Sequence, residues 1–328
     1  MSANCAMTAT RTSSAAAINT NQFMNNYLGN DKFLKYLSSN ETKMNRIYQK
    51  SILNIFSLAA LGFLKGKIKT SDLLGSRAAL KPKYRSLLDA KISAELKKNG
   101  VDVGDDYIGI FGKKFFFVNL EEVISGFLPI VVHDQYDAMR FLKEDSVVID
   151  AGANIGIFSV LAANLCPKGK IYAFEPASIT FDALNKNTGQ YENMLAYRNG
   201  VGDKNVTKKL FVKKWALGTN YIEDTVMEGH DPDDYPDSEE VKIITIDSFV
   251  KENNLSHVDF IKMDTEGYEP NILNGAKETI RRFSPTIAMS AYHHPSHKTE
   301  LPKMVLSAHP DYKYELRTDG EEDFIFWV

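Results

Sequence analysis

The most constraining feature of the chain is an apolar run that leads directly into a glycine-rich turn and then into another apolar run. The segment reads Val-Val-Ile-Asp-Ala-Gly-Ala-Asn-Ile-Gly-Ile-Phe-Ser over residues 147–159, and its turn carries Asp150, Gly152, Asn154 and Gly156. We expect a strand, a tight turn and a helix. In open α/β sheets such a turn places a ligand at the carboxyl ends of the strands. The helix that follows has an N-terminus that favours a carboxylate or a phosphate.

The spacing of this turn argues against a dinucleotide-binding domain, which carries Gly-x-Gly-x-x-Gly. Asn154 occupies the second glycine position, and Gly156 comes one residue early. A second signal follows about 20 residues further on, where the apolar run Lys-Ile-Tyr-Ala-Phe ends in Glu175. Nucleotide-binding α/β domains have at that place the carboxylate that accepts hydrogen bonds from ribose hydroxyls. Together the two signals predict a ligand that contains a nucleoside.

Strand-like and helix-like runs alternate over the C-terminal two thirds of the chain. This alternation predicts an α/β fold, with a mostly parallel, doubly wound sheet and helices on both of its faces. A β-hairpin is expected before it, over residues 107–118, and an antiparallel hairpin after it, over residues 312–328. The short β-rich runs lie at residues 147–150, 170–174, 195–198, 242–246, 260–263 and 286–290.

The first hundred residues follow a different pattern. Residues 1–22 are rich in Ala, Ser, Thr and Asn, with Arg11 as their one charged side chain, so we expect a disordered tail. Apolar residues recur at helical spacing over residues 23–105, which predicts a helical region that shapes the site or forms a homodimer contact. Its helices are expected near residues 23–37, 47–64 and 87–96. The α/β domain is then expected over residues 106–328.

Composition excludes several classes of protein. The net charge of -3 offers no basic excess, so we expect no nucleic acid as partner and favour a small or neutral substrate such as a sugar. Cys5 and Cys166 form neither a disulfide framework nor a zinc motif. The longest apolar stretch, residues 52–64, is shorter than the roughly 20 residues of a spanning helix. We therefore expect no membrane span and a cytoplasmic location.

Three segments together resemble the FkbM family of methyltransferases. They are residues 148–159, the Phe-Glu-Pro of 174–176, and the rarer Ile-Lys-Met-Asp-Thr-Glu-Gly-Tyr-Glu-Pro-Asn-Ile-Leu-Asn-Gly-Ala of 261–276. The resemblance covers residues 130–328, and it implies a class I, Rossmann-like methyltransferase fold. It further implies S-adenosylmethionine as the methyl donor and O-methylation of a carbohydrate or natural-product hydroxyl. The alternatives are an N-methyltransferase of a small molecule, a nicotinamide-dependent oxidoreductase and a non-catalytic nucleotide-binding protein.

The resemblance assigns the glycine turn to the donor. Asp150 would serve the donor's amino-acid end, directly or through water. Gly152, Asn154 and Gly156 would wrap its methionine half, and Phe158 completes this part of the binding set.

Four further residues belong to the expected donor site. Glu175 would hold the ribose. Asn199 and Gly200 follow the third strand, where they either line the adenine pocket or form a plain turn. Tyr136 precedes the glycine motif and either touches the donor's carboxylate or packs in the core.

Two strand ends supply the candidates for catalysis, because transfer to a hydroxyl needs alignment of the reactants and a base or a metal. Asp264 and Glu266 follow the strand at 260–263, and either would hold the donor's amino group or the acceptor hydroxyl. His293 follows the next strand and is the expected general base, with His294 as the alternate.

Glu269 and His297 of the same region are expected to have no catalytic role. Glu269 is expected to be an ordinary acid in the first turn of a helix, and His297 to point into solvent. A divalent metal held by Asp264, Glu266 and one histidine is the alternative to a histidine base. No spacing rule supports that metal, so it is not favoured and its ligands stay unassigned.

Overall fold

The computed structural model describes residues 31–42, 89–213, 217–225, 235, 237–318 and 321–328. The tail expected over residues 1–22 and the helix expected over residues 47–64 lie outside these ranges.

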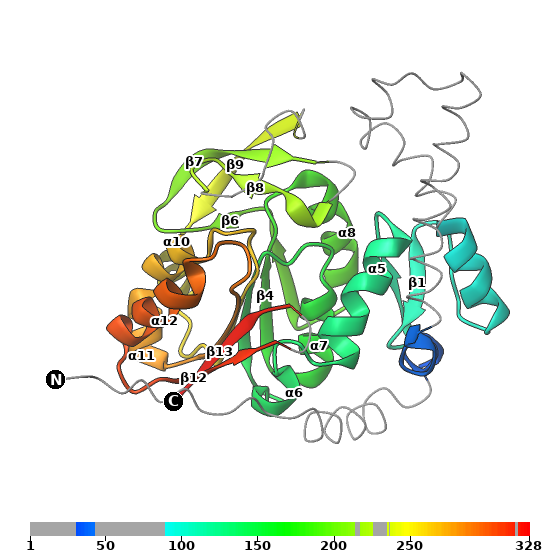
Figure 1. The fold of residues 1–328 in the computed structure, drawn as a ribbon, viewed down its shortest axis with the longest axis horizontal. Coiled ribbons are helices and arrows are strands. Elements are labelled where there is room, and N and C mark those ends of the chain that lie inside the picture. The colour runs from blue at the N-terminus through cyan, green and yellow to red at the C-terminus, as the bar shows by residue number, and fades with distance from the viewer. Residues whose placement is uncertain (1–30, 43–88, 214–216, 226–234, 236, 319–320) are drawn as a thin grey trace.

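Seven strands form the main sheet, in the order β12-β13-β11-β10-β3-β4-β5 (Figure 1). Five adjacent strands, from β11 through β10, β3 and β4 to β5, run parallel to one another. β13 is antiparallel to both β11 and β12. The expected α/β class is therefore confirmed, and the antiparallel pair lies at the end of the chain, where a hairpin was expected. The strands are β3 (Val147–Ala151), β4 (Lys170–Phe174), β5 (Met194–Tyr197), β10 (Phe260–Met263), β11 (Thr286–Ser290), β12 (Lys313–Arg317) and β13 (Asp323–Trp327).

Helices cover both faces of this sheet because successive strand residues point to opposite sides. In β3, Val148 belongs to one buried apolar cluster and Ile149 to the other. The first cluster includes the helices that precede β5, and the second includes those that follow β9. One face carries α5 (Leu120–Phe127), the π-helix η1 (Leu128–Val132), α6 (Ala138–Phe141), α7 (Ile157–Leu165) and α8 (Ser178–Thr188); the other carries α9 (Ile246–Glu252), α10 (Glu269–Asn274), α11 (Lys277–Phe283) and α12 (His297–Ala308).

A second, four-stranded sheet lies beside the main one, in the order β6-β9-β7-β8. It corrects one prediction. The strand expected at residues 242–246 was assigned to the parallel sheet, but it ends β9, and Ile246 already begins α9. The charge-rich residues 208 and 209 lie in β7, where the neighbouring Leu210 and Val212 are buried. The strands are β6 (Gly200–Val201), β7 (Val206–Val212), β8 (Tyr221–Ile222) and β9 (Asp237–Ile244), with the short helix η2 (Leu217–Thr219).

The charge-rich run 230–240 is described only in part. Most of it lies outside the described residues, and its last four residues, 237–240, are the start of β9. Exposure alternates along β9, where Ser238, Glu240 and Lys242 are exposed and Val241 and Ile243 are buried, because one side of the strand faces solvent and the other the core.

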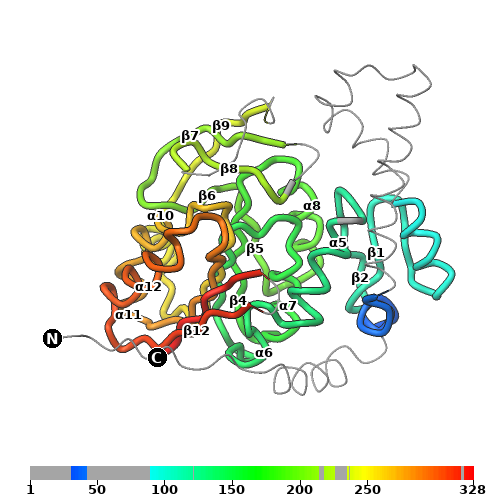
Figure 2. Tube along the Cα trace, viewed as in Figure 1, coloured from blue at the N-terminus to red at the C-terminus, as the bar shows by residue number. Residues whose placement is uncertain are grey.

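The described N-terminal elements pack onto the helical layer that contains α5 and α7. They comprise helices at residues 32–42 and 89–98 and the hairpin of β1 (Tyr107–Ile110) with β2 (Lys113–Phe116), which confirms the first expected hairpin. Figure 2 shows this hairpin beside α5 and away from α10–α12. Phe33 and Phe115 both pack edge-on against Phe127 of α5, with ring centroids 5.5 and 5.0 Å away. These elements therefore share one apolar cluster with the main sheet.

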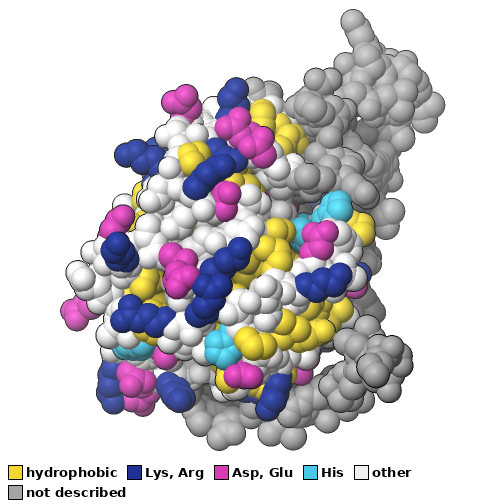
Figure 3. Space-filling view, turned by 90° about the vertical axis from the view of Figure 1, so that its left-hand side faces the viewer, with side chains coloured by type: hydrophobic (Ala, Val, Ile, Leu, Met, Phe, Trp, Pro, Cys, Tyr) yellow, Lys and Arg dark blue, Asp and Glu magenta, His cyan; other side chains and the backbone are white. Residues whose placement is uncertain are grey.

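Charges of both signs share one face of the surface (Figure 3). On the face in Figure 3, Lys and Arg side chains are interspersed with Asp and Glu. No helix in the described ranges is long and apolar enough to cross a bilayer.

Candidate functional site

A cavity of about 490 Å³ opens at the carboxyl ends of the parallel strands. Its volume lies within the range of small-molecule sites, and its position is where open α/β sheets bind ligands. The second sheet and the segment α5–η1 contribute the rest of its walls. Among the residues expected at the site, the cavity is lined by Tyr136, Gly152, Asn154, Phe158, Glu175, Asn199, Gly200, Asp264 and Glu266.

The glycine turn is pressed against the loop that follows β10. Gly152 has a φ of +75°, and a Cβ there would lie 2.0 Å from the backbone oxygen of Asp264. Only glycine fits, because both the conformation and the space exclude a side chain. Asn154 also has a positive φ, of 51°, and its Oδ1 is buried without a hydrogen-bond partner among the described residues. The turn thus contains one buried acceptor without a hydrogen-bond partner among the described residues.

Glu175 is a buried carboxylate held in one orientation. Its oxygens accept hydrogen bonds from the backbone N–H groups of Asn154 and Ala177 and from the hydroxyl of Thr180, each at 2.9 Å. Burial raises the pKa of Glu175, and these hydrogen bonds oppose the rise. A carboxylate has about four acceptor positions, so one remains for a ligand hydroxyl. This geometry suits the predicted ribose contact.

Asp150 corrects a prediction, because it does not reach the cavity. It is fully buried, and its register partner on β10 is Lys262. The ammonium of Lys262 lies 3.2 Å from Asp150 Oδ1 and donates to the carbonyl of Gly152 at 2.7 Å, while Ser159 donates to Asp150 Oδ2. Asp150 therefore neutralises Lys262 beneath the turn. Gly156 is likewise outside the cavity lining, and with a φ of +95° it precedes the first residue of α7.

Asp264 and Glu266 follow β10 and face the cavity with different acidities. Burial raises the pKa of Asp264, but Lys262 and His293 outweigh it and hold the pKa below its usual value. The hydroxyl of Tyr136 donates to Asp264 Oδ2 at 3.0 Å. For Glu266, burial outweighs His293 and raises the pKa, and its φ of 55° is rare for a residue with a side chain. Asp264 is therefore firmly ionised, and Glu266 is the stronger base.

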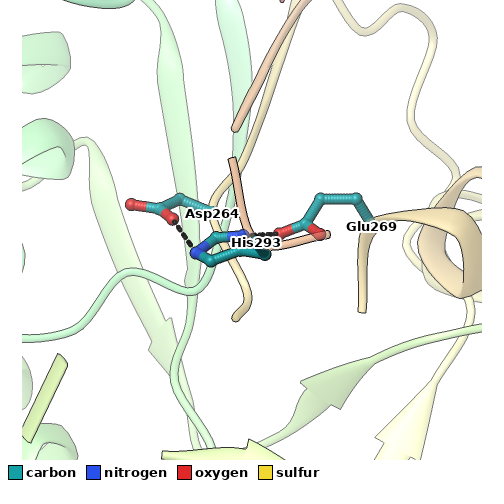
Figure 4. Close-up of side chains that lie close together, drawn as sticks. All are labelled: Asp264, Glu269 and His293. Carbon is teal, nitrogen blue, oxygen red and sulfur yellow. Dashed lines mark ion pairs between the residues drawn. The ribbon is translucent and has the colours of Figure 1, made fainter. Parts of the chain in front are cut away.

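His293 lies behind these carboxylates, and its surroundings contradict the predicted role as general base. Its side chain is 3% exposed and does not line the cavity. Figure 4 shows the ring between Asp264, 3.7 Å from Nε2, and Glu269, 3.3 Å from Nδ1. Burial lowers the pKa of His293, but Glu266, Glu269 and Asp264 raise it to about 11. An imidazolium at neutral pH cannot accept a proton, so His293 bridges the carboxylates.

Glu269 lies in the first turn of α10, as expected, but it is not an ordinary surface acid, and the prediction that His297 points into solvent was wrong. Glu269 is fully buried and accepts from the backbone N–H of Thr265 at 2.8 Å and from its hydroxyl at 3.1 Å. His297 is 4% exposed, with Nδ1 3.7 Å from Glu269. His294, the alternate base, accepts from or donates to Ser296 at 2.9 Å and does not line the cavity. Only the packing of α12 against α10 brings these groups together, which no sequence spacing reveals.

Comparison with known proteins places this arrangement in a family. A family model described as "Methyltransferase FkbM domain" matches residues 150–316. The chain belongs to the FkbM methyltransferase family. "Methyltransferase 1" of Beauveria bassiana (strain ARSEF 2860) is 29% identical over 160 residues, which cover 44% of this chain and 64% of that protein. The match thus spans just under two thirds of that relative.

Two further similarities were found. "2-O-methyltransferase NoeI" of Sinorhizobium fredii is 26% identical over 196 residues, which cover 53% of this chain and 78% of that protein. A crystal structure of "Methyltransferase FkbM" from Methylobacillus flagellatus KT shares 22% identity, with a TM-score of 0.43, over 57% of this chain and 44% of that one.

In this FkbM-family chain, Asp264, Glu269 and His293 have ligand atoms within 4.8 Å of one another, close enough for a metal ion. However, His293 turns one ring nitrogen to Asp264 and the opposite one to Glu269 (Figure 4). A metal ion takes one ring nitrogen, whereas a protonated ring serves two carboxylates at once. The geometry therefore favours a bridging imidazolium.

Gln135, Tyr292 and Glu321 are among the cavity residues of this FkbM-family site that carried no signal in the sequence. They come from the segment before α6, the end of β11 and the residues before β13. No motif marked them, because they are adjacent only after the sheet has formed.

Proposed function

We propose that this chain is an S-adenosylmethionine-dependent O-methyltransferase that acts on a hydroxyl of a carbohydrate or natural-product acceptor. The observation that carries the proposal is the cavity itself, with the fixed carboxylate of Glu175 at one strand end and the pair Asp264 and Glu266 two strands away. A relative named as a 2-O-methyltransferase supports oxygen as the methylated atom. We place the catalytic domain over residues 106–328 and assign residues 23–105 to a helical region beside it.

The donor fits the residues present. Glu175 would accept from its ribose hydroxyls, and Gly152 and Asn154 of the crowded turn line the cavity beside it. Asn199 and Gly200 line the wall beyond Glu175, which suits the adenine. The donor supplies an activated methyl group, so the chain's own task is alignment and removal of one proton.

Three residues divide that task. Asp264 is held ionised and accepts from Tyr136, so we assign it to the donor's amino group. Glu266 lines the cavity with a raised pKa, so we assign it the acceptor's hydroxyl proton. His293 is a positioning residue, since it touches Glu266 and Glu269 but not the cavity. An amine acceptor needs no such base, which favours oxygen over nitrogen.

Calorimetric titration of the whole chain with S-adenosylhomocysteine and, separately, with NADH tests the donor. The proposal predicts saturable binding of S-adenosylhomocysteine and none of NADH. Binding of NADH alone would replace it with the oxidoreductase alternative. Transfer of labelled methyl from S-adenosylmethionine to hydroxyl compounds, undiminished by EDTA, then separates an enzyme with a carboxylate base from a metal-dependent one or a non-catalytic binder.

A further inference from the structure

At the end of the cavity away from Glu175, side chains from separate segments meet around Glu321. The Nε2 group of Gln135 lies 3.4 Å from Glu321 Oε2 and donates to Asp323 at 2.9 Å. The hydroxyl of Tyr292 also acts on Glu321, because it lowers the pKa of that carboxyl against the effect of burial. Gln135, Tyr292 and Glu321 all line the cavity, whereas Asp323 is fully buried and fixes Gln135 from behind.

The sheet order separates this group from the nucleoside end. Glu175 follows β4, and Glu321 precedes β13, whose Asp323 lies opposite Ser290 at the carboxyl end of β11. β4 and β13 are four strand spacings apart, or about 19 Å. A donor anchored at Glu175 with its reactive centre near Asp264 therefore leaves the Glu321 end for the acceptor.

The charge of the lining restricts what can enter. Five carboxylates line the cavity in the described part of the chain: Glu122, Glu175, Asp264, Glu266 and Glu321. Lys262 is the single cationic lining residue in those ranges, and Asp150 and the carbonyl of Gly152 already occupy its ammonium. A carboxylate or phosphate on the acceptor beside Glu321 would meet a like charge, whereas hydroxyl groups donate to carboxylates.

We propose that Glu321, oriented by Gln135 and Tyr292, selects an uncharged acceptor rich in hydroxyls and rejects acceptors with an acidic group beside the reacting hydroxyl. This inference rests on the proposed donor site. Glu321 is a specificity residue rather than part of the proton transfer, since Glu266 and Asp264 lie two strands away.

Two donor analogues test the selection without a known acceptor. In both, nitrogen replaces the sulfur of S-adenosylhomocysteine and carries a third arm, 3-hydroxypropyl in one and 2-carboxyethyl in the other. Burial raises the pKa of Glu321, so titrations are run at pH 8 to keep it ionised. We expect the hydroxypropyl analogue to bind roughly tenfold more tightly than the carboxyethyl analogue. Glu321→Gln should shrink this ratio at least about threefold, because one repelling charge is gone.

Glu322→Gln is the matched control, because its carboxylate pairs with Lys298 at 2.6 Å and does not line the cavity. It should leave the ratio unchanged. Equal affinities in the natural chain, a ratio that Glu321→Gln does not alter, or failure of both analogues while S-adenosylhomocysteine binds would each overturn the inference. Failure of S-adenosylhomocysteine itself would instead refute the donor site on which the inference depends.

Discussion

The two ends of the cavity are built in different ways. At the end with Glu175, this carboxylate is held by backbone N–H groups and a nearby hydroxyl. The adjoining glycine turn is shaped by positive φ angles at Gly152 and Asn154. At the other end, charged and polar side chains from distant segments hold one another, as Gln135 and Tyr292 do around Glu321.

This difference separates what is general from what is particular to this chain. Backbone groups and glycines form a cradle that depends on the strand–turn–helix geometry, so a change that obstructs the backbone disrupts the cradle as a whole. Side-chain clusters depend on each member, so single replacements there alter acidity or selectivity while the fold persists. The predictions below test each side of this contrast.

The largest effect is expected from Gly152→Ala. Its Cβ would lie 2.0 Å from the backbone oxygen of Asp264, so the two loops must separate. We expect binding of S-adenosylhomocysteine to be lost in calorimetry, or the chain not to fold. Gly112→Ala is the control, because Gly112 has a φ of +71° but nothing within 4 Å of the added Cβ. It should cost about 1 kcal/mol in stability and leave binding intact; equal behaviour of the two variants would contradict the account.

The next largest effect is expected from Glu266→Gln. Removal of a general base lowers the rate by about 10²- to 10⁴-fold. We expect kcat for methyl transfer to fall in this range while affinity for S-adenosylhomocysteine stays the same. In the unmodified chain kcat should also fall as the pH drops through the raised pKa of Glu266, since only the carboxylate accepts a proton.

Glu252→Gln is the control for this variant, since Glu252 is exposed at the end of α9. It should keep the full rate. If Glu266→Gln also kept the full rate, proton removal would have to be assigned to another group.

A smaller effect is expected from Glu175→Gln. Hydrogen bonds to a charged group contribute about 1.5–3 kcal/mol, so affinity for S-adenosylhomocysteine should fall by roughly ten- to hundredfold. Thermal melting of the same protein shows whether the turn survives, because Glu175 also holds the N–H of Asn154. Glu144→Gln, at an exposed ion pair with Lys168, should change neither quantity. Unchanged affinity in the Glu175 variant would remove the ribose contact.

The smallest perturbation compares two buried histidines by NMR of their ring nitrogens. The carboxylates raise the pKa of His293 to about 11, whereas burial lowers that of His297. At pH 8 we expect His293 to be protonated and His297 neutral. The stabilisation from His293 is then complete below its unfolded pKa of about 6.5 and is lost as the pH rises towards 11. A neutral His293 at pH 8 would restore it as a candidate base.

The sequence predicted the end of the cavity at Glu175 better than it predicted the region of Glu269, His293 and Glu321. The reason is physical. The strand, Gly152 and Glu175 belong to one continuous βαβ segment, so residue spacing alone brings them to the same edge of the sheet. Asp150 was placed wrongly because its role depends on Lys262, which lies opposite it on β10 and is remote in sequence.

Around Glu269 and Glu321, burial and ion pairing gave the histidines different surroundings from those that the sequence predicted. His293 and His297 looked like loop histidines, yet Glu269 of α10 and the packing of α12 bury both. Their charge states depend on neighbours that only the folded chain supplies. Glu321 carried no motif at all, because its partners come from before α6 and after β11.

A crystal structure of the chain with S-adenosylhomocysteine tests the central claim most directly. The account predicts the ribose hydroxyls within hydrogen-bond distance of Glu175, the amino-acid end beside Gly152 and Asp264, and the sulfur facing Glu266. A nucleoside bound elsewhere, or turned so that its ribose meets Asp264 and its amino acid meets Glu175, would contradict it.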